Sequence, residues 1–329
     1  GGLVVFPTET VYGLGANAYD AKAVIKIFKA KERPIDNPLI VHINSINQLV
    51  NLTSEQPEEV FIIAKKFWPG PITVVLPKSK KVPKEVTAGL PTIAIRMPAH
   101  PVALKLIELS GVPIAAPSAN LSGKPSPTTS EHVIRDMYGR VDIIIDAGET
   151  LFGIESTIID LTHRPPVLLR PGAIPVEEIE KVLNIKIKIP AFARGLIEAE
   201  KASAPGLKYR HYAPEKALTL IESSNYSNYE EYARKVMNIA QNYIKKGLRI
   251  IILASKETSK YYMSKGFKVI TLGSRKNIFE VAKNLFKILR IIDEMNVDMA
   301  ICEGFEEKGL GLTIMNRLRK ASGCNIIKV

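Results

Sequence analysis

The 329-residue chain has little cysteine and no long apolar run. Its two cysteines, Cys302 and Cys324, indicate neither a disulfide framework nor a cysteine zinc site. No apolar run reaches the length of a membrane span, and we expect no membrane contact. We find no signal peptide, and because the sequence begins with Gly directly before an expected strand, we expect the natural N-terminus to lie upstream. A cytoplasmic protein is therefore expected.

Several motifs that would identify a catalytic or nucleotide site are also absent. The sequence has no G-x-x-x-x-G-K-[ST] phosphate loop, and no G-x-G-x-x-G follows the first expected strand of its C-terminal part. No Ser-His-Asp order, paired carboxylates or metal-ligand spacing is convincing. We therefore expect no protein metal site, and any bound phosphate would be held by side chains and helix ends.

The composition is that of an ordinary globular protein, with 46% hydrophobic and 24% charged residues, and the length suits two domains. The net charge of +12 is uneven, because residues 191–329 carry 24 Lys and Arg against 14 Asp and Glu. This excess would suit a polyanion such as RNA. A solvated Lys-rich surface is the alternative that we favour, since no basic cluster is interleaved with aromatics over a long stretch.

The first stretch of the chain places polar side chains just after a buried strand. Leu3–Phe6 is apolar and stops at Pro7, Thr8–Thr10 follow, and from about Ala21 the pattern is helical. Open α/β sheets bind ligands outside the carboxyl ends of their strands. This stretch is therefore either one wall of a ligand site or an ordinary strand-to-helix turn.

Residues 1–190 combine many short strands with few helices, which predicts a mixed, highly twisted sheet. A strand of small residues is expected directly before Ser118, and the polar residues Ser118 and Asn120 lie in the loop that follows it. The other expected strands are Leu39–Ile43, Ile72–Leu76, Thr92–Met97, Val141–Ile145, Ser156–Leu161 and Pro166–Arg170, and helices are expected from about Ala21 and over Pro57–Phe67, Val102–Leu109 and Ser130–Tyr138.

The C-terminal part alternates strands and helices regularly, which predicts a smaller Rossmann-like parallel α/β domain. We expect this domain over residues 217–329, after a first domain over residues 1–190. Residues 191–216 form the expected linker, which is rich in Tyr, His, Lys and Arg beyond the needs of a flexible tether.

Polar groups gather at strand and helix ends of residues 1–190. Most are hydrogen-bond donors and four are cations, which suits an anionic ligand with several oxygens, such as a nucleoside triphosphate or a carboxylate. The alternative is that they are scattered surface and capping residues. The set is Thr8, Thr10, Lys31, Arg33, Asn37, His42, Thr92, Arg96, Ser118, Asn120, Ser126, Ser156 and Arg170.

Several of these residues lie in three motifs, PTETVYGLG (residues 7–15), KERP (31–34) and PSANLSGKPS (117–126). Together the three motifs resemble the YrdC-like threonylcarbamoyl-AMP synthases. The later SAPG and KYRHYAP segments and the α/β C-terminal part resemble the two-domain form of that family. The resemblance implies an N-terminal YrdC-like catalytic domain. It also implies a nucleotidyltransferase that converts L-threonine, bicarbonate and ATP with Mg²⁺ into L-threonylcarbamoyl-AMP and pyrophosphate.

The resemblance further implies that a tRNA-modifying threonylcarbamoyl transferase complex receives the product, and a weak contact with tRNA is a further expectation. It assigns catalysis to Lys31, Arg33, Ser118 and Asn120, L-threonine binding to Thr10, His42, Arg96, Ala116 and Ser156, and ATP binding to Arg33, Asn37, Thr92, Ser118, Ser126, Arg170 and Tyr209. An RNA-binding or regulatory module that uses the same basic cavity is the alternative.

The residue types suit this chemistry. The carbamate and the α-phosphate are both anionic, so Lys31 and Arg33 would reduce their repulsion. Arg96 suits a bidentate contact with the amino-acid carboxylate, and His42 is expected to be an orienting donor rather than a base. The 203–214 segment is expected to close over the nucleotide. Phosphate oxygens and water would hold the Mg²⁺.

Overall fold

The computed structural model describes residues 1–198 and 212–329. The described residues divide into two units, one made of 1–122 and 126–198, the other of 123–125 and 212–329. Residues 199–211 lie outside the described residues; they are half of the expected linker and include Tyr209 and the expected closing segment up to residue 211. Within the described ranges, no helix combines the length and apolarity needed to cross a membrane.

The first unit is built on a nine-stranded sheet with the strand order β7-β1-β2-β6-β3-β5-β4-β8-β9. Strand β3 runs parallel to β5 and antiparallel to β6, and β4 runs antiparallel to β5 and parallel to β8, so the predicted mixed sheet is confirmed. The strands are β1 (Val4–Phe6), β2 (Gly13–Asn17), β3 (Ile40–His42), β4 (Ile72–Pro77), β5 (Thr92–Arg96), β6 (Ile114–Ala116), β7 (Ile143–Ile144), β8 (Thr157–Asp160) and β9 (Val167–Arg170).

The first stretch differs from the expected strand-to-helix turn. After Pro7 the chain turns back as β2, which pairs antiparallel with β1 and then with β6. Gly15 lies where a Cβ atom would stand 2.7 Å from the Ile114 side chain and 2.8 Å from the Phe6 ring, so only glycine fits there without displacement. Residues 7–12 therefore form the connection of an antiparallel strand pair inside the sheet.

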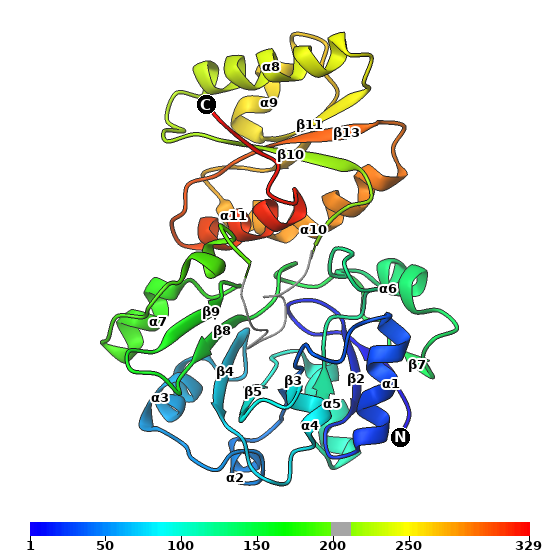
Figure 1. Ribbon diagram of the computed structural model, residues 1–329, viewed down its shortest axis with the longest axis vertical. Coiled ribbons are helices and arrows are strands. Elements are labelled where there is room, and N and C mark those ends of the chain that lie inside the picture. Colours follow the sequence, from blue (N-terminus) through cyan, green and yellow to red (C-terminus); the bar gives the residue numbers. More distant parts are fainter. Residues whose placement is uncertain (199–211) are drawn as a thin grey trace. The chain divides into compact units, whose positions relative to one another are not determined.

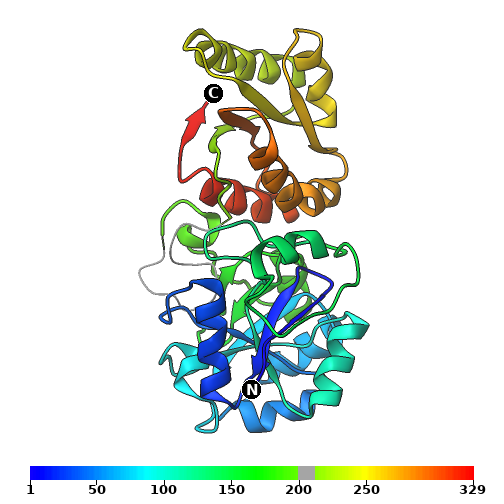
Figure 2. The same ribbon diagram turned by 90° about the vertical axis from the view of Figure 1, so that its right-hand side faces the viewer.

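Helices flank this sheet, and Figure 2 shows α1 standing beside the first two strands. The Asp20 side chain accepts hydrogen bonds from the N–H groups of Lys22 and Ala23 and so caps the start of α1. The sequence did not predict α7. The helices are α1 (Ala21–Lys31), α2 (Leu49–Leu52), α3 (Glu58–Phe67), α4 (Lys84–Thr87), α5 (Pro101–Ser110), α6 (Ser130–Met137) and α7 (Val176–Leu183), with 3₁₀ turns at Ile46–Gln48 and Ala191–Arg194.

The second unit contains a five-stranded, entirely parallel sheet with the order β12-β11-β13-β10-β14, which confirms the predicted α/β domain. Helices α8 and α9 cover one face, and α10 and α11 cover the other (Figure 1). The elements are β10 (Ala217–Glu222), α8 (Tyr229–Lys245), β11 (Ile250–Ser255), α9 (Lys256–Met263), β12 (Val269–Gly273), α10 (Ile278–Glu294), β13 (Met299–Glu303), α11 (Leu310–Ala321) and β14 (Ile326–Lys328).

A buried ion pair lies at the carboxyl ends of these parallel strands. Arg275 Nη2 is 2.8 Å from Glu303 Oε2, and the Arg275 Nε–H donates to Ser255 Oγ. The Tyr262 hydroxyl donates to the other Glu303 oxygen, and the guanidinium lies 4.6 Å from the centre of the Phe305 ring. Both charges are thus paired and hydrogen-bonded, as buried charges must be to be tolerated.

The short segment Gly123–Pro125 belongs to the second unit although it is far from the rest of that unit in sequence. The Arg290 guanidinium donates two hydrogen bonds to the Pro125 carbonyl oxygen, at 2.6 and 3.1 Å. Lys124 pairs with Glu215 at 3.2 Å. The second unit is therefore discontinuous along the chain.

Candidate active site

A chain of hydroxyl groups orders the connection between β1 and β2. Thr8 Oγ1 donates to the Val11 carbonyl at 2.6 Å, so its single proton is used there. The 2.8 Å contact between the hydroxyls of Thr8 and Thr10 therefore has Thr10 as its donor. Thr10 Oγ1 in turn accepts from Arg96 Nη1 at 2.9 Å. The orientation of Thr10 is fixed by this sequence of bonds.

Three contacts immobilise Arg96, which ends β5 and is buried. Besides Thr10, its guanidinium contacts the Gly70 carbonyl, to which Nε donates at 3.3 Å, and the Glu9 carboxylate, with Nη2 2.6 Å from Oε1. The Glu9 contact is an ion pair whose atoms are close but not aligned as a hydrogen bond. Within the described residues, neither Glu9 oxygen has a hydrogen-bond partner. A fixed guanidinium is the group that binds a carboxylate with defined geometry.

His42 lies next to Arg96, because the parallel register of β3 and β5 pairs the two residues. On the other side β6 places Ile114 opposite His42, with Ala116 two residues further along the same strand. Burial, and secondarily the charge of Arg96, lowers the pKa of His42 to about 3. The imidazole is therefore neutral near pH 7, which agrees with an orienting group better than with a base that must gain a proton.

Ser156 and Arg170, which were expected to bind different ligands, are in direct contact. The Arg170 guanidinium donates to the Ser156 carbonyl at 2.9 and 3.2 Å and to its hydroxyl at 3.2 Å. Ser156 Oγ is also 2.7 Å from the hydroxyl of Thr73 on β4, a buried polar group that the apolar pattern of that strand did not indicate. The structure thus groups the two residues at one point.

The loop after β6 lies against the first connection of the sheet. The Leu14 N–H donates to the Pro117 carbonyl, and the Ala119 N–H donates to the Tyr12 carbonyl. Between these bonds, Gly13 and Ser118 form an isolated antiparallel bridge. Two of the stretches that carry the family resemblance, more than 100 residues apart in sequence, are therefore side by side.

Lys31 attaches the end of α1 to the same loop. Its ammonium group is buried and donates to the carbonyl oxygens of Ser118 and Asn120, while its own carbonyl accepts from the Ser122 N–H. Within the loop, Ser118 Oγ donates to Asn120 Oδ1 at 2.5 Å. Lys31, Ser118 and Asn120, all expected to be catalytic, form one hydrogen-bonded group.

Arg33 follows the end of α1 and contacts the segment just before β3. Its Nη2 donates to the carbonyls of Asn37 and Pro38, both at 3.2 Å. Asn37 is 1% exposed, and within the described residues its Oδ1 has no hydrogen-bond partner. Thr92 begins β5, four residues before Arg96, which corresponds to roughly 13 Å along a strand. Thr92, expected to bind ATP, thus lies at the opposite end of β5 from Arg96, expected to bind threonine.

Ser126 was also expected to bind ATP, and it is buried beside a carboxylate that the sequence reasoning missed. Its hydroxyl donates to Glu155 Oε1 at 2.8 Å. The Glu155 backbone is held by close packing, since a Cβ atom on Gly172 would lie 2.5 Å from the Glu155 carbonyl oxygen. The only sequence signal for Glu155 was its position next to Ser156.

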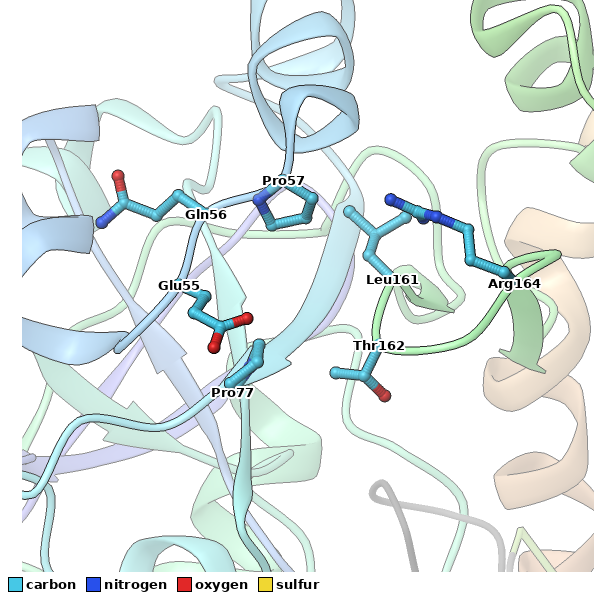
Figure 3. A pocket seen from close by; sticks show the side chains of 7 residues that line it. All are labelled: Glu55, Gln56, Pro57, Pro77, Leu161, Thr162 and Arg164. Carbon is cyan, nitrogen blue, oxygen red and sulfur yellow. The ribbon is translucent and has the colours of Figure 1, made fainter.

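Residues 1–198 and 212–329 contain no group of three His, Cys, Asp or Glu side chains arranged as a metal site. A cavity of ≈ 350 Å³ lies elsewhere on the first unit, and Figure 3 shows its lining side chains. None of the expected site residues lines it. The lining residues are Glu55, Gln56, Pro57, Pro77, Leu161, Thr162 and Arg164.

Two family models match the chain. Residues 1–172 match the model described as telomere recombination, which covers Sua5, YciO and YrdC, and residues 174–323 match the threonylcarbamoyl-AMP synthase C-terminal domain. The chain is 53% identical to a threonylcarbamoyl-AMP synthase of Pyrococcus abyssi, over 100% of this chain and 93% of the relative. It is 48% identical to the Bacillus subtilis threonylcarbamoyl-AMP synthase, over 99% and 91% of the two chains.

The fold is also similar to that of a solved structure, P. abyssi Sua5 complexed with L-threonine. The TM-score is 0.91 at 53% identity, and the match covers 100% of this chain and 92% of that one. A Schizosaccharomyces pombe threonylcarbamoyl-AMP synthase is 40% identical over 97% of this chain and 84% of the relative. The similarity therefore includes both units.

Proposed function

This chain belongs to the threonylcarbamoyl-AMP synthase family, and we propose that it joins L-threonine, bicarbonate and ATP into L-threonylcarbamoyl-AMP with release of pyrophosphate. It is thus an enzyme of the nucleotidyltransferase type. The observation that carries the proposal is the immobilised guanidinium of Arg96, beside Thr10 and neutral His42. A relative of the same fold is known in complex with L-threonine, the amino acid that such a site would bind.

In the first step the threonine amine attacks the carbon of bicarbonate, a C–N bond forms, and water leaves to give the carbamate. Arg96 would hold the α-carboxylate, which orients the amine for attack. The neutral imidazole of His42 would orient the substrate by a hydrogen bond, and Thr10 could add only a weak contact through the remaining lone pair of its hydroxyl oxygen. One methyl group distinguishes threonine from serine, so the pocket can discriminate by only about 1–3 kcal/mol.

In the second step a carbamate oxygen attacks the α-phosphate and pyrophosphate leaves. Both reactants are anionic, so fixed positive charge lowers the barrier. Lys31 and Arg33 would provide that charge at the end of α1. Ser118 and Asn120 lie in the loop after β6, to which the Lys31 side chain is hydrogen-bonded. Asn37, Thr92, Ser126 and Arg170 would contact the nucleotide.

Mg²⁺ would enter with ATP and neutralise phosphate charge. The part of the chain that the structure describes has no cluster of three metal-binding side chains, so the residues fit an ion held mainly by phosphate oxygens and water. The product would pass to a tRNA-modifying threonylcarbamoyl transferase complex in the cytoplasm. A weak contact with tRNA belongs to the same proposal.

ATP–pyrophosphate exchange tests the proposal. We expect labelled pyrophosphate to enter ATP only when L-threonine and bicarbonate are both present. Exchange that is independent of threonine would contradict the proposed substrate. Absence of exchange together with tight, salt-sensitive RNA binding would favour an RNA-binding module instead.

A further inference from the structure

Glu9 is a buried carboxylate to which the proposed reaction gives no task. It lies between β1 and β2, is 5% exposed, and is fixed by a backbone bond in which the Phe152 N–H donates to the Glu9 carbonyl at 2.9 Å. Its partner Arg96 comes from the distant strand β5. Its position is therefore set by the fold and not by local chain flexibility.

The Glu9 carboxylate is paired with the charge of Arg96 but lacks the hydrogen bonds that a buried carboxylate normally accepts. A buried ionised carboxylate is tolerated when it is paired and when donors reach its oxygens. The pairing is present, since Glu9 Oε1 is 2.6 Å from Arg96 Nη2. Among the described residues, however, neither oxygen of Glu9 accepts an aligned hydrogen bond. Glu9 thus has acceptor capacity for a cationic donor.

The chemistry of the substrate supplies such a donor. L-Threonine is a zwitterion whose ammonium and carboxylate groups are attached to the same carbon. If its carboxylate lies on Arg96, its ammonium is brought close to the carboxylate that is paired with Arg96. In this arrangement the ligand carboxylate lies on the Arg96 guanidinium and the ligand ammonium lies on the Glu9 carboxylate, so that positive and negative groups alternate. Resting on the proposed function, we propose that Glu9 is the acceptor for the α-ammonium group of L-threonine.

The neighbouring groups are less suited to this role. The Thr10 hydroxyl already accepts from Arg96 and donates to Thr8. The other buried carboxylate of the site, Glu155, accepts from Ser126. Glu9 is therefore the carboxylate at Arg96 that holds acceptor capacity for the amine, and it selects an amino acid over a hydroxy acid of the same shape.

The test uses the full chain and two ligands. L-Threonine carries the ammonium group, whereas (R)-3-hydroxybutanoate keeps the hydroxyl, methyl and carboxylate but lacks it. Calorimetric titration measures both affinities for the wild-type chain, for Glu9→Gln and for the control Glu108→Gln, whose carboxylate is exposed and pairs with Lys105. We expect the wild-type chain to prefer threonine by ~10- to 100-fold, the size of a charge-assisted hydrogen bond.

Glu9→Gln should lose most of that preference by weakening threonine binding, with hydroxybutanoate binding nearly unchanged. Equal weakening of both ligands would show that Glu9 only holds Arg96 in place, and would overturn the proposal. Should Glu9→Gln fail to fold, equal affinities of the wild-type chain for the two ligands would overturn it as well. A wild-type chain that prefers threonine but lacks threonine-dependent exchange would reject the proposed function while leaving the role of Glu9 supported.

Discussion

The two units treat their buried polar groups differently. In the second unit Arg275 and Glu303 are buried and bound by each other and by neighbouring side chains. In the first unit Glu9, Asn37 and His42 are equally buried, yet within the described residues each has at least one polar atom without a hydrogen-bond partner. Unmet hydrogen-bonding capacity in a native interior calls for an explanation, and a ligand is one. Under the proposed function, the unmet acceptors mark the first unit as the part that binds the ligand, whereas the paired groups of the second unit stabilise its fold.

The largest effect that tests this comparison is expected in the second unit. Glu303→Gln leaves the buried guanidinium of Arg275 without its counter-charge, so the free energy of unfolding should fall by about 3–5 kcal/mol in urea denaturation. Lys235→Gln removes a half-exposed i,i+4 pair with Glu231 in the same unit, and should cost less than about 1 kcal/mol. Threonine-dependent exchange per folded molecule should stay unchanged in both. Loss of exchange at unchanged stability in Glu303→Gln would break the comparison.

Substitution of the cations at the end of α1 should have the next largest effect, on activity. Arg33→Ala removes charge from the reacting groups and should lower the exchange rate by about 10²- to 10³-fold. Lys31→Ala should lower it similarly and also cost about 1–3 kcal/mol of stability, since the carbonyls of Ser118 and Asn120 lose a donor. Lys29→Ala, on the exposed face of the same helix, is the control. Arg33→Ala with unaltered exchange would mean that Arg33 is structural.

His42 should give a smaller effect that depends on pH. Its folded-state pKa of about 3 is below the ordinary value of 6.5, so the unfolded chain takes up a proton first as the pH falls. The stability contribution of neutral His42 is therefore fully present above pH 6.5 and is lost towards pH 3, by at most about 1.4 kcal/mol per pH unit. Between pH 6 and 4, the free energy of unfolding should fall more steeply for the wild-type chain than for His42→Gln. Parallel profiles would show that His42 titrates normally.

The smallest expected effect is on the rate at which the two cysteines of the second unit react with a thiol reagent. Cys302 is buried on β13, and burial raises the pKa of its thiol, whereas Cys324 is exposed. A thiol reagent should therefore label one group in the native protein, and Cys324→Ser should abolish the fast labelling without a change in stability. Fast labelling of Cys302 would mean that the second sheet opens more readily than its packing indicates.

Regular periodicity made the second unit predictable. Its strands and helices alternate with long apolar faces, and the observed elements follow the strand–helix alternation expected from the sequence. In the first unit β2 was missed because Gly13, Gly15 and Asn17 have low strand propensity, and pairing with β1 and β6 makes this segment a strand. A packing partner thus overrode local preference there.

The candidate site was predictable only in part for a related reason. The side chains of Lys31, Ser118 and Asn120 were expected from the family resemblance, and the structure joins them by hydrogen bonds. The contact of Glu9 with Arg96 joins residues far apart in the chain, and one sequence holds no signal for such a pairing. Thr73 was hidden in an apolar strand pattern because it is a buried residue of that strand, where its hydroxyl is hydrogen-bonded to Ser156.

The discontinuity at Gly123–Pro125 has a practical consequence for dissecting this protein. Expression of residues 1–198 alone would separate the Pro125 carbonyl from the Arg290 guanidinium, directly before Ser126. The truncated chain would then differ from the intact one in two ways. It would lack the second sheet, and its Gly123–Pro125 loop, which precedes the expected nucleotide contact Ser126, would lose its hydrogen bonds to Arg290. Arg290→Met in the undivided chain isolates the second change, and it is the cleaner way to ask what the second unit contributes.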